Sequence, residues 1–341
     1  MKKTISLLGA LLVAQLLLAF GLSFTGPRLS ARSADKPLFS LGGSKVDRIT
    51  IEGPHQDKIV LAKAGGAWQL PDEGNFPADQ ARADALVKTL EGLKEGMPVA
   101  TTSQALARFK VGDDRFDRRI TLAGAGKTLA TLYFGTSPSM REIHARRSGQ
   151  RDVYSVAFAT YQAPAKAESW VDKAILQVPK KDIEAINVAG LHIARVAPPP
   201  APGSNAARPG WEATGLATGQ ALDTGAADKL AGLLAGLRIG SVLGKDAKPD
   251  YGLDHPVLTL SLVKAGGQNI GYALGKGKDG KTYTLKASTR DEYFRLPDYA
   301  ASPLLDAARR DKLLAASEAS HAPAAKLGKP AAKLGKPVAK G

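Results

Sequence analysis

The sequence predicts an α+β protein made of two tandem repeats, each a mostly antiparallel sheet with one long amphipathic helix, after an N-terminal transmembrane helix. Two similar segments carry this prediction: ADALVKTLEGLKEG begins at Ala83, and ADKLAGLLAGLRIG begins at Ala227, 144 residues later. Other landmarks recur at nearly the same offset, among them Trp68 with Trp211. Self-similarity at a fixed spacing indicates a duplicated domain.

Composition fits two globular domains and excludes several kinds of site. Of the 341 residues, 44% are hydrophobic and 23% are charged, as in ordinary folded domains. The chain has no cysteine, which excludes disulfides, cysteine-ligated metal centres and thiol catalysis. Aromatic residues make up 6% of the chain, which disfavours an aromatic-lined surface for nucleic acid or sugar.

The N-terminal segment predicts a membrane anchor. After Lys2 and Lys3, residues 5–24 carry no charge and only Gln15 as a strongly polar residue. An apolar helix of this length crosses a hydrocarbon core about 30 Å thick, and no good small-residue cleavage site follows it. We therefore expect residues 1–24 to be an uncleaved signal-anchor in the inner membrane, with the bulk of the chain periplasmic or extracytoplasmic. A cleaved signal peptide is the alternative.

A polar linker over residues 25–43 leads to the first repeat, which we expect over residues 44–176. Between its third and fourth strands, leucines at i, i+4 and i+7 mark one face of a helix from Pro77 to Leu93, with Pro77 at the first helical position. Alternation of apolar and polar residues predicts strands at 46–51, 58–62, 67–70, 119–122, 129–134 and 153–156.

The second repeat, expected over residues 179–314, follows the same order, with its helix from Asp223 to Leu237. A proline-rich loop begins at Ala197 and is unsuited to strand pairing. Residues 315–341 contain AAKLGKP twice and are expected to be a disordered basic tail. The expected strands are 183–188, 192–196, 258–263, 270–274, 283–286 and 293–296.

One segment, GKGKDGKT from Gly275 to Thr282, matches the phosphate-binding P-loop pattern letter for letter. A P-loop leads into a helix whose N-terminus faces the phosphates. Here the residues that follow, from Tyr283 to Lys286, alternate like a strand, and the Asp-Gly pair before them favours a tight hairpin turn. We therefore expect a hairpin loop and no nucleotide binding.

No other pattern yields a candidate catalytic, cofactor-binding or metal-binding residue. Ser33 and Lys36 have the spacing of a Ser/Lys acyl-enzyme pair but lie in the linker. Trp68 and Trp211 are expected to be core anchors. The histidines lack the spacing of a helical metal pair; they are His55, His144, His192, His255 and His321. An acidic cluster is expected to face solvent; it consists of Asp113, Asp114 and Asp117.

Several short motifs recur in a known family. Besides the anchor, they are Asp47–Gly53, Gly66–Leu70, Pro77–Asp79, Tyr251–Pro256 and Arg310–Leu314. With them the chain resembles a bacterial membrane-anchored family known as domain of unknown function 4340. The first repeat departs from the pattern, because Phe109–Asp113 stands where a Tyr-Gly-Leu turn is expected. The resemblance implies no established activity; such proteins are often encoded beside ABC-type transporters resembling gliding-motility auxiliary components.

Three function classes follow from these observations. The leading expectation is a non-enzymatic accessory or scaffold protein, anchored in the membrane and associated with an ABC-type transport or motility complex. The formal net charge of +15 prompts the second, a basic module that binds anionic lipid or cell-envelope polymer. The third is an unrecognised extracytoplasmic enzyme. We expect no cofactor, and neither nucleic acid nor nucleotide as a partner.

Overall fold

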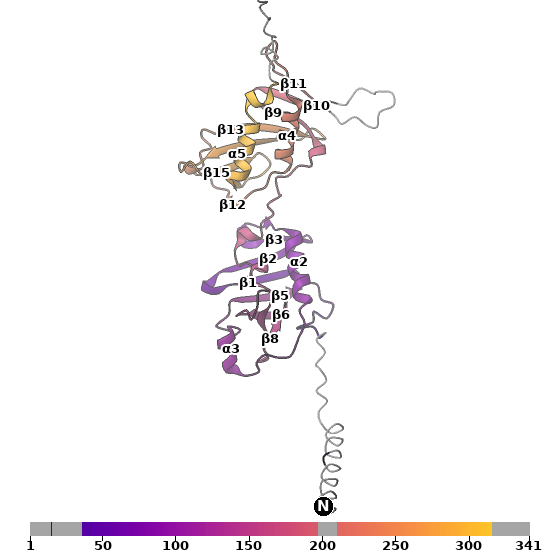
Figure 1. Ribbon diagram of the computed structural model, residues 1–341, viewed down its shortest axis with the longest axis vertical. Helices are drawn as coiled ribbons and strands as arrows, with labels where there is room; N and C mark the ends of the chain where they lie inside the picture. The colour runs from indigo at the N-terminus through magenta and orange to yellow at the C-terminus, as the bar shows by residue number, and fades with distance from the viewer. Residues whose placement is uncertain (1–14, 16–35, 197–209, 316–341) are drawn as a thin grey trace, which may run out of the picture. The chain divides into compact units, whose positions relative to one another are not determined.

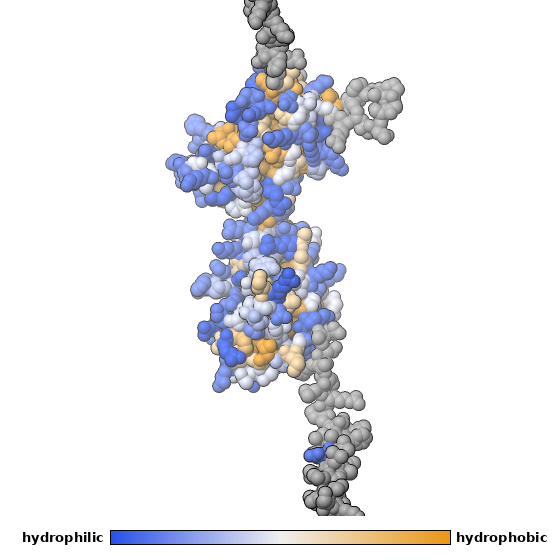
Figure 2. Space-filling model, viewed as in Figure 1, coloured by the Kyte–Doolittle hydropathy of each residue, from blue (hydrophilic) through white to orange (hydrophobic). Residues whose placement is uncertain are grey.

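The computed structural model describes residues 36–196 and 210–315, together with Gln15. The chain divides into two compact units, Met1–Ile175 and Leu176–Gly341, which we call unit 1 and unit 2. Most of the visible surface of both units is hydrophilic (Figure 2). Apolar residues accordingly gather inside each unit, as the globular composition predicts.

An eight-stranded antiparallel sheet forms the framework of unit 1 (Figure 1), in the order β4-β3-β2-β1-β5-β6-β7-β8. Its helices are α2 (Gln80–Glu91) and α3 (Ser103–Phe109). Its strands are β1 (Arg48–Glu52), β2 (Lys58–Ala64), β3 (Ala67–Leu70), β4 (Phe76–Pro77), β5 (Arg118–Gly124), β6 (Lys127–Phe134), β7 (Ile143–Arg147) and β8 (Tyr154–Val156).

Unit 2 has a second eight-stranded antiparallel sheet, in the order β11-β10-β9-β13-β14-β15-β16-β12. Its helices are α4 (Thr224–Ala235), α5 (Asp298–Ala307) and α6 (Arg310–Leu313). Its strands are β9 (Ile183–Val188), β10 (Leu191–Val196), β11 (Gly210–Thr214), β12 (Ser241–Gly244), β13 (Leu258–Lys264), β14 (Asn269–Lys276), β15 (Tyr283–Ala287) and β16 (Tyr293–Leu296).

The two sheets share one internal order. The run β3-β2-β1-β5-β6-β7-β8 corresponds strand for strand to β11-β10-β9-β13-β14-β15-β16. Register agrees as well: Thr50 lies opposite Thr121 across β1 and β5, and Asn187 lies opposite Ser261 across β9 and β13. Two similar sheet units therefore confirm the internal repeat predicted from the sequence, and the fold is a mixed α+β arrangement.

The long helices occupy equivalent places in the two units. Helix α2 contacts β3, and α4 contacts the equivalent strand β11. Each helix begins after an aspartate, Asp79 or Asp223, whose side chain accepts the N–H of the residue three positions further on. Such a cap satisfies one of the free N–H groups at a helix start.

The predicted element boundaries were wrong in several places. Pro77 lies in β4 opposite Gln69, and Asp79 is the cap of α2, so the helix begins at Gln80 and not at Pro77. The sequence-based assignment also missed α3, β7, β12, α5 and α6. Helix α5 contains Pro303, a residue type that ordinarily ends a helix, which explains why it was overlooked.

Each sheet has a face turned toward its long helix and a second face, which we call the open face. In unit 2, α4 and α5 lie over one face of the sheet (Figure 1), where Leu234 and Leu304 approach Leu260 and Leu274. Side chains alternate between the two faces along a strand. The residues between these sheet leucines therefore belong to the open face.

Apart from Gln15, the predicted signal-anchor over residues 1–24 lies outside the described residues. So do the first part of the linker, the proline-rich loop and all but the first residue of the basic tail. In the part of the chain that the structure describes, no helix is long and apolar enough to cross a membrane.

Candidate functional site

A row of large side chains crosses the open face of unit 1. Glu52, Arg119, Tyr133 and Arg146 lie directly opposite one another on β1, β5, β6 and β7. Nε and Nη2 of Arg119 donate to the two carboxylate oxygens of Glu52 at 2.5 and 2.6 Å. This two-point contact holds the pKa of Glu52 below its usual value.

Arg146 anchors the other end of this row. The residue is 3% exposed, its Nε donates to the Val111 carbonyl oxygen at 2.6 Å, and its Nη2 donates to Asp113 at 2.5 Å. Its guanidinium carbon lies 4.4 Å from the centre of the Tyr133 ring. Tyr133 packs with Val111 and Val153 in a buried apolar cluster. The chain that follows α3 therefore closes this part of the open face of unit 1.

In unit 2 the same row holds smaller residues. Thr259, Ala273 and Lys286 lie opposite one another on β13, β14 and β15, where unit 1 has Arg119, Tyr133 and Arg146. The position equivalent to Glu52 is occupied by Ala189, which follows β9.

The loss of these side chains leaves an open hollow of about 730 Å³ over β10, β9, β13, β14 and β15, which we call the unit 2 hollow. Its floor includes Ser261, Gly271 and Ala273. A volume of this size lies in the usual range of ligand pockets, roughly 300–1,000 Å³.

A chain of hydrogen bonds lines one side of the unit 2 hollow. Nδ1 of His192 lies 2.6 Å from Oδ1 of Asn187, whose Nδ2 donates to Oγ of Ser261 at 2.9 Å. Oγ of Ser288 accepts the N–H of Gly271 at 2.9 Å. Since an amide oxygen only accepts, His192 carries its proton on Nδ1 in this arrangement. The first two contacts therefore join β10, β9 and β13, and the third ties β14 to Ser288, just after β15.

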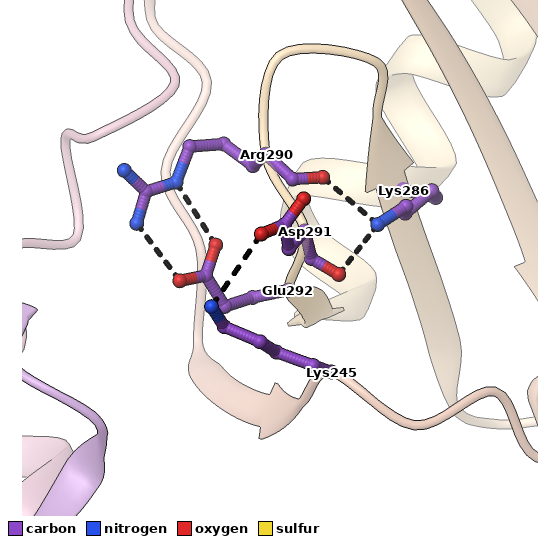
Figure 3. Close-up of polar contacts among 5 residues, drawn as sticks. All are labelled: Lys245, Lys286, Arg290, Asp291 and Glu292. Carbon is purple, nitrogen blue, oxygen red and sulfur yellow. Dashed lines mark hydrogen bonds and ion pairs between the residues drawn. The ribbon is translucent and has the colours of Figure 1, made fainter.

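Lys286 lies at the opposite end of the unit 2 hollow from His192. Its Nζ donates to the carbonyl oxygens of Arg290 at 2.8 Å and Asp291 at 2.5 Å (Figure 3). The same Nζ lies 4.6 Å from the centre of the Tyr293 ring. The Asp291 carboxylate pairs instead with Lys245, at 3.4 Å. Backbone oxygens thus hold the ammonium in position at this end of the unit 2 hollow.

A tryptophan joins the long helix to the sheet in both units. Nε1 of Trp68 donates to Oδ1 of Asp84 in α2 at 2.8 Å, and Nζ of Lys63 lies 4.7 Å from the centre of the indole. Trp68 is 1% exposed and its counterpart 4%, so the prediction of core anchors is confirmed. The same three roles in unit 2 belong to Trp211, Asp228 and Arg195.

The P-loop-like segment is a β-hairpin. Lys276 lies opposite Tyr283 across β14 and β15, so a strand follows the loop. Oδ1 of Asp279 accepts the N–H groups of Lys281 and Thr282 and the Thr282 hydroxyl, at 2.9, 3.0 and 3.0 Å. The hairpin predicted from the sequence is confirmed, and the absence of nucleotide binding stays a prediction.

The histidines and acids singled out in the sequence are dispersed. His144 is buried, with Nδ1 2.9 Å from Oγ1 of Thr136. The acidic cluster does more than face solvent, because Asp117 pairs with Lys110 at 3.3 Å and Asp113 pairs with Arg146. Across residues 36–196 and 210–315, no group of three or more histidine, aspartate or glutamate side chains is placed to hold a metal ion.

The structure does not describe the Ser33/Lys36 spacing, set aside in the sequence because it lies in the linker, as a site. Ser33 lies outside the described residues, and Nζ of Lys36 pairs with the Glu95 carboxylate at 2.8 Å. The unit 2 hollow, in contrast, was missed because its residues form no motif. A signal was nevertheless present: 140 residues after Arg119 and Tyr133, the second copy has Thr259 and Ala273.

Comparison with known proteins agrees with the resemblance drawn from the motifs. The family model described as "Domain of unknown function (DUF4340)" matches residues 68–256. No curated protein and no solved structure matches the chain. The family match covers most of the sheet of unit 1 and the part of unit 2 that precedes β13, which is more than half of the chain. The protein therefore belongs to the DUF4340 family, a family defined by a domain of unknown function.

Proposed function

We propose that this protein is a non-enzymatic accessory or scaffold protein, anchored by its N-terminal apolar segment and working outside the cytoplasm with an ABC-type transport or motility complex. We further propose that the unit 2 hollow is where it docks its partner. One observation carries the docking surface: the row that Glu52, Arg119 and Tyr133 fill in unit 1 is empty of large side chains in unit 2.

The chemistry of the unit 2 hollow supports binding over catalysis. Its polar side chains are committed to one another, as in the chain from His192 through Asn187 to Ser261. A catalytic group, by contrast, must direct its donor or acceptor at the substrate. A pre-arranged face with small residues on its floor suits the packing of a partner's side chains.

The membrane part of the proposal rests on the uncharged stretch at residues 5–24, and the transporter part rests on the family resemblance. Carbonate extraction tests the anchor. We expect the full-length chain to stay with the membranes, and release of an N-terminally shortened chain would contradict an uncleaved signal-anchor.

Site-specific photocrosslinking in native membranes tests the docking surface and the partner together. A photoreactive amino acid replaces Ser261 in the unit 2 hollow, and the matched control carries it at Thr121, the equivalent position in unit 1. We expect an adduct with an ABC-type transporter subunit from position 261 and a much weaker one from position 121. Equal labelling from both positions would contradict a docking role for the unit 2 hollow, and an adduct lacking transporter subunits would contradict the partner.

A further inference from the structure

We infer that the unit 2 hollow receives an aromatic side chain from an extended, acidic segment of the partner protein, at the place that the Tyr133 ring occupies in unit 1. This inference rests on the proposed docking role and adds the chemistry of the occupant.

The duplication provides the template for the occupant. Tyr133 lies between Arg119 on β5 and Arg146 on β7, and Ala273 lies between Thr259 on β13 and Lys286 on β15. The two positions are therefore equivalent by register, and unit 2 differs by the absence of a ring. The protein's own first copy shows that this fold packs a ring there.

The surroundings of the ring are only partly rebuilt in unit 2. In unit 1, Tyr133 is 5% exposed, with the Arg146 guanidinium 4.4 Å from its centre and the Phe116 ring at 5.8 Å. In unit 2, Lys286 lies opposite Ala273 and supplies the cation, and Tyr293 lies one strand further on, opposite Lys286 on β16. A cation beside an aromatic face attracts the electron-rich ring. Unit 2 thus keeps a cation beside the position of the ring and omits the ring.

Charge specifies the residues beside the ring. The side chains that line the unit 2 hollow include Lys286 at one end and His192 at the other, and none of the lining residues is acidic. An acidic flank on the incoming segment is attracted by Lys286, whereas a basic flank is repelled.

The volume fits a short segment better than a single side chain. About 730 Å³ extends across five strands, so a ring placed over Ala273 leaves room for residues on both sides. The small residues Gly271 and Ser261 line the hollow beside Ala273 and leave space for those residues.

Nuclear magnetic resonance with short capped peptides tests the inference on the full-length protein in detergent micelles. The probes are Gly-Glu-Tyr-Glu-Gly, the same peptide with Leu in place of Tyr, and Gly-Lys-Tyr-Lys-Gly. We expect the acidic tyrosine peptide to shift the Ala273 methyl and Gly271 amide signals with millimolar affinity. The leucine and lysine peptides are expected to bind at least about tenfold more weakly, a difference of one decade in Kd. Equal binding of the three peptides would overturn the inference.

Ala273→Tyr supplies the matched variant, because it inserts the residue that unit 1 has at this position. We expect it to abolish the peptide-induced shifts while dispersed amide signals from the other strands of unit 2 report an intact unit 2. Ala273→Val fills less of the space and serves if the larger variant fails to fold; it is expected to weaken binding several-fold. Unchanged affinity in a folded variant at this position would overturn the inference.

The two proposals fail in distinguishable ways. Peptide binding without a crosslink from position 261 would support the aromatic binding site and contradict the proposed transporter partner. A crosslink from Ser261 that persists in Ala273→Tyr would keep the docking surface and overturn the aromatic occupant. Tyr161 and Tyr299 are exposed rings of this chain. Self-association that Ala273→Tyr abolishes would assign the unit 2 hollow to a second copy and overturn the partner assignment.

Discussion

Two glycines hold the same loop against the same strand in both units, and their substitution tests the duplication at atomic level. A Cβ added to Gly135, which directly follows β6, would lie 1.9 Å from the Phe109 carbonyl oxygen. A Cβ added to Gly275 of β14 would lie 2.2 Å from the Tyr251 carbonyl oxygen. Ordinary contacts between carbon and oxygen are about 3.3 Å or longer. In each unit the loop must therefore retreat by roughly 1 Å.

The obstructing atoms belong to the backbone, so no side-chain rotation relieves the overlap. Overpacking of a rigid site costs about 1–3 kcal/mol and occasionally more. We expect Gly135→Ala and Gly275→Ala to cost about 3 kcal/mol each, at the upper end of that range. Gly271 lies on the same strand as Gly275, and a Cβ there meets nothing closer than Ser288 at 3.7 Å. Gly271→Ala is therefore the matched control, with a gain of about 0.5–1 kcal/mol expected for a strand.

Hydrogen exchange followed by mass spectrometry is the suitable assay, because peptides from each unit report the opening free energy of that unit separately. Gly135→Ala should lower protection in unit 1, and Gly275→Ala should lower protection in unit 2. If the opening free energy of unit 2 in Gly275→Ala lies within about 0.5 kcal/mol of that in Gly271→Ala, Gly275 does not pack closely against the Tyr251 carbonyl oxygen.

Three further substitutions probe single features of the fold. Lys110 ends α3 in the left-handed region, with a φ of 53°, and also pairs with Asp117. Lys110→Gly should therefore be about 0.5–1 kcal/mol more stable in urea unfolding than Lys110→Ala, which loses the same pair, and equal stabilities would contradict the strain. Because Arg119 lowers the pKa of Glu52, the charged form is stabilised in the folded state. The free energy of unfolding of the wild type should therefore exceed that of Glu52→Gln by about 1 kcal/mol near neutral pH. This difference should shrink as the pH falls below 4.5, where the Glu52 carboxylate takes up a proton. A difference that stays constant across that range would show that the Glu52–Arg119 pair contributes little. Lys281→Ala should change stability by no more than about 0.5 kcal/mol and leave ATP binding absent, whereas Asp279→Ala should loosen the hairpin, measured by exchange of its amides; ATP binding that depends on Lys281 would revive the P-loop reading.

The sequence predicted elements whose pattern is local. The repeated helices and the hairpin at Asp279 follow from apolar spacing and turn chemistry, and both are present in the structure. Strand β7 was missed because its sequence, IHARR, hides the alternation: Arg146 is buried by bonds to Val111 and Asp113, which lie far away in the chain. Tertiary contacts of this kind override local propensity.

The unit 2 hollow depends on register and could not be derived from one copy alone. Ala273 is an ordinary small strand residue until it is aligned with Tyr133, and Thr259 is unremarkable until it is aligned with Arg119. The repeat offset changes from 144 residues at the helix to 140 at these strands, because the connection before them is shorter in unit 2. Only the paired strands fix which side chains are equivalent.

The most direct test of the central claim is the exchange of one residue between the two open faces. Tyr133→Ala removes a buried ring and should lower the opening free energy of unit 1 by about 3–5 kcal/mol. Ala273→Tyr places the same ring over the unit 2 hollow and should change the opening free energy of unit 2 by less than about 1 kcal/mol, since the space is already there. A loss of about 1–3 kcal/mol or more in Ala273→Tyr, the usual cost of overpacking, would contradict an open face in unit 2.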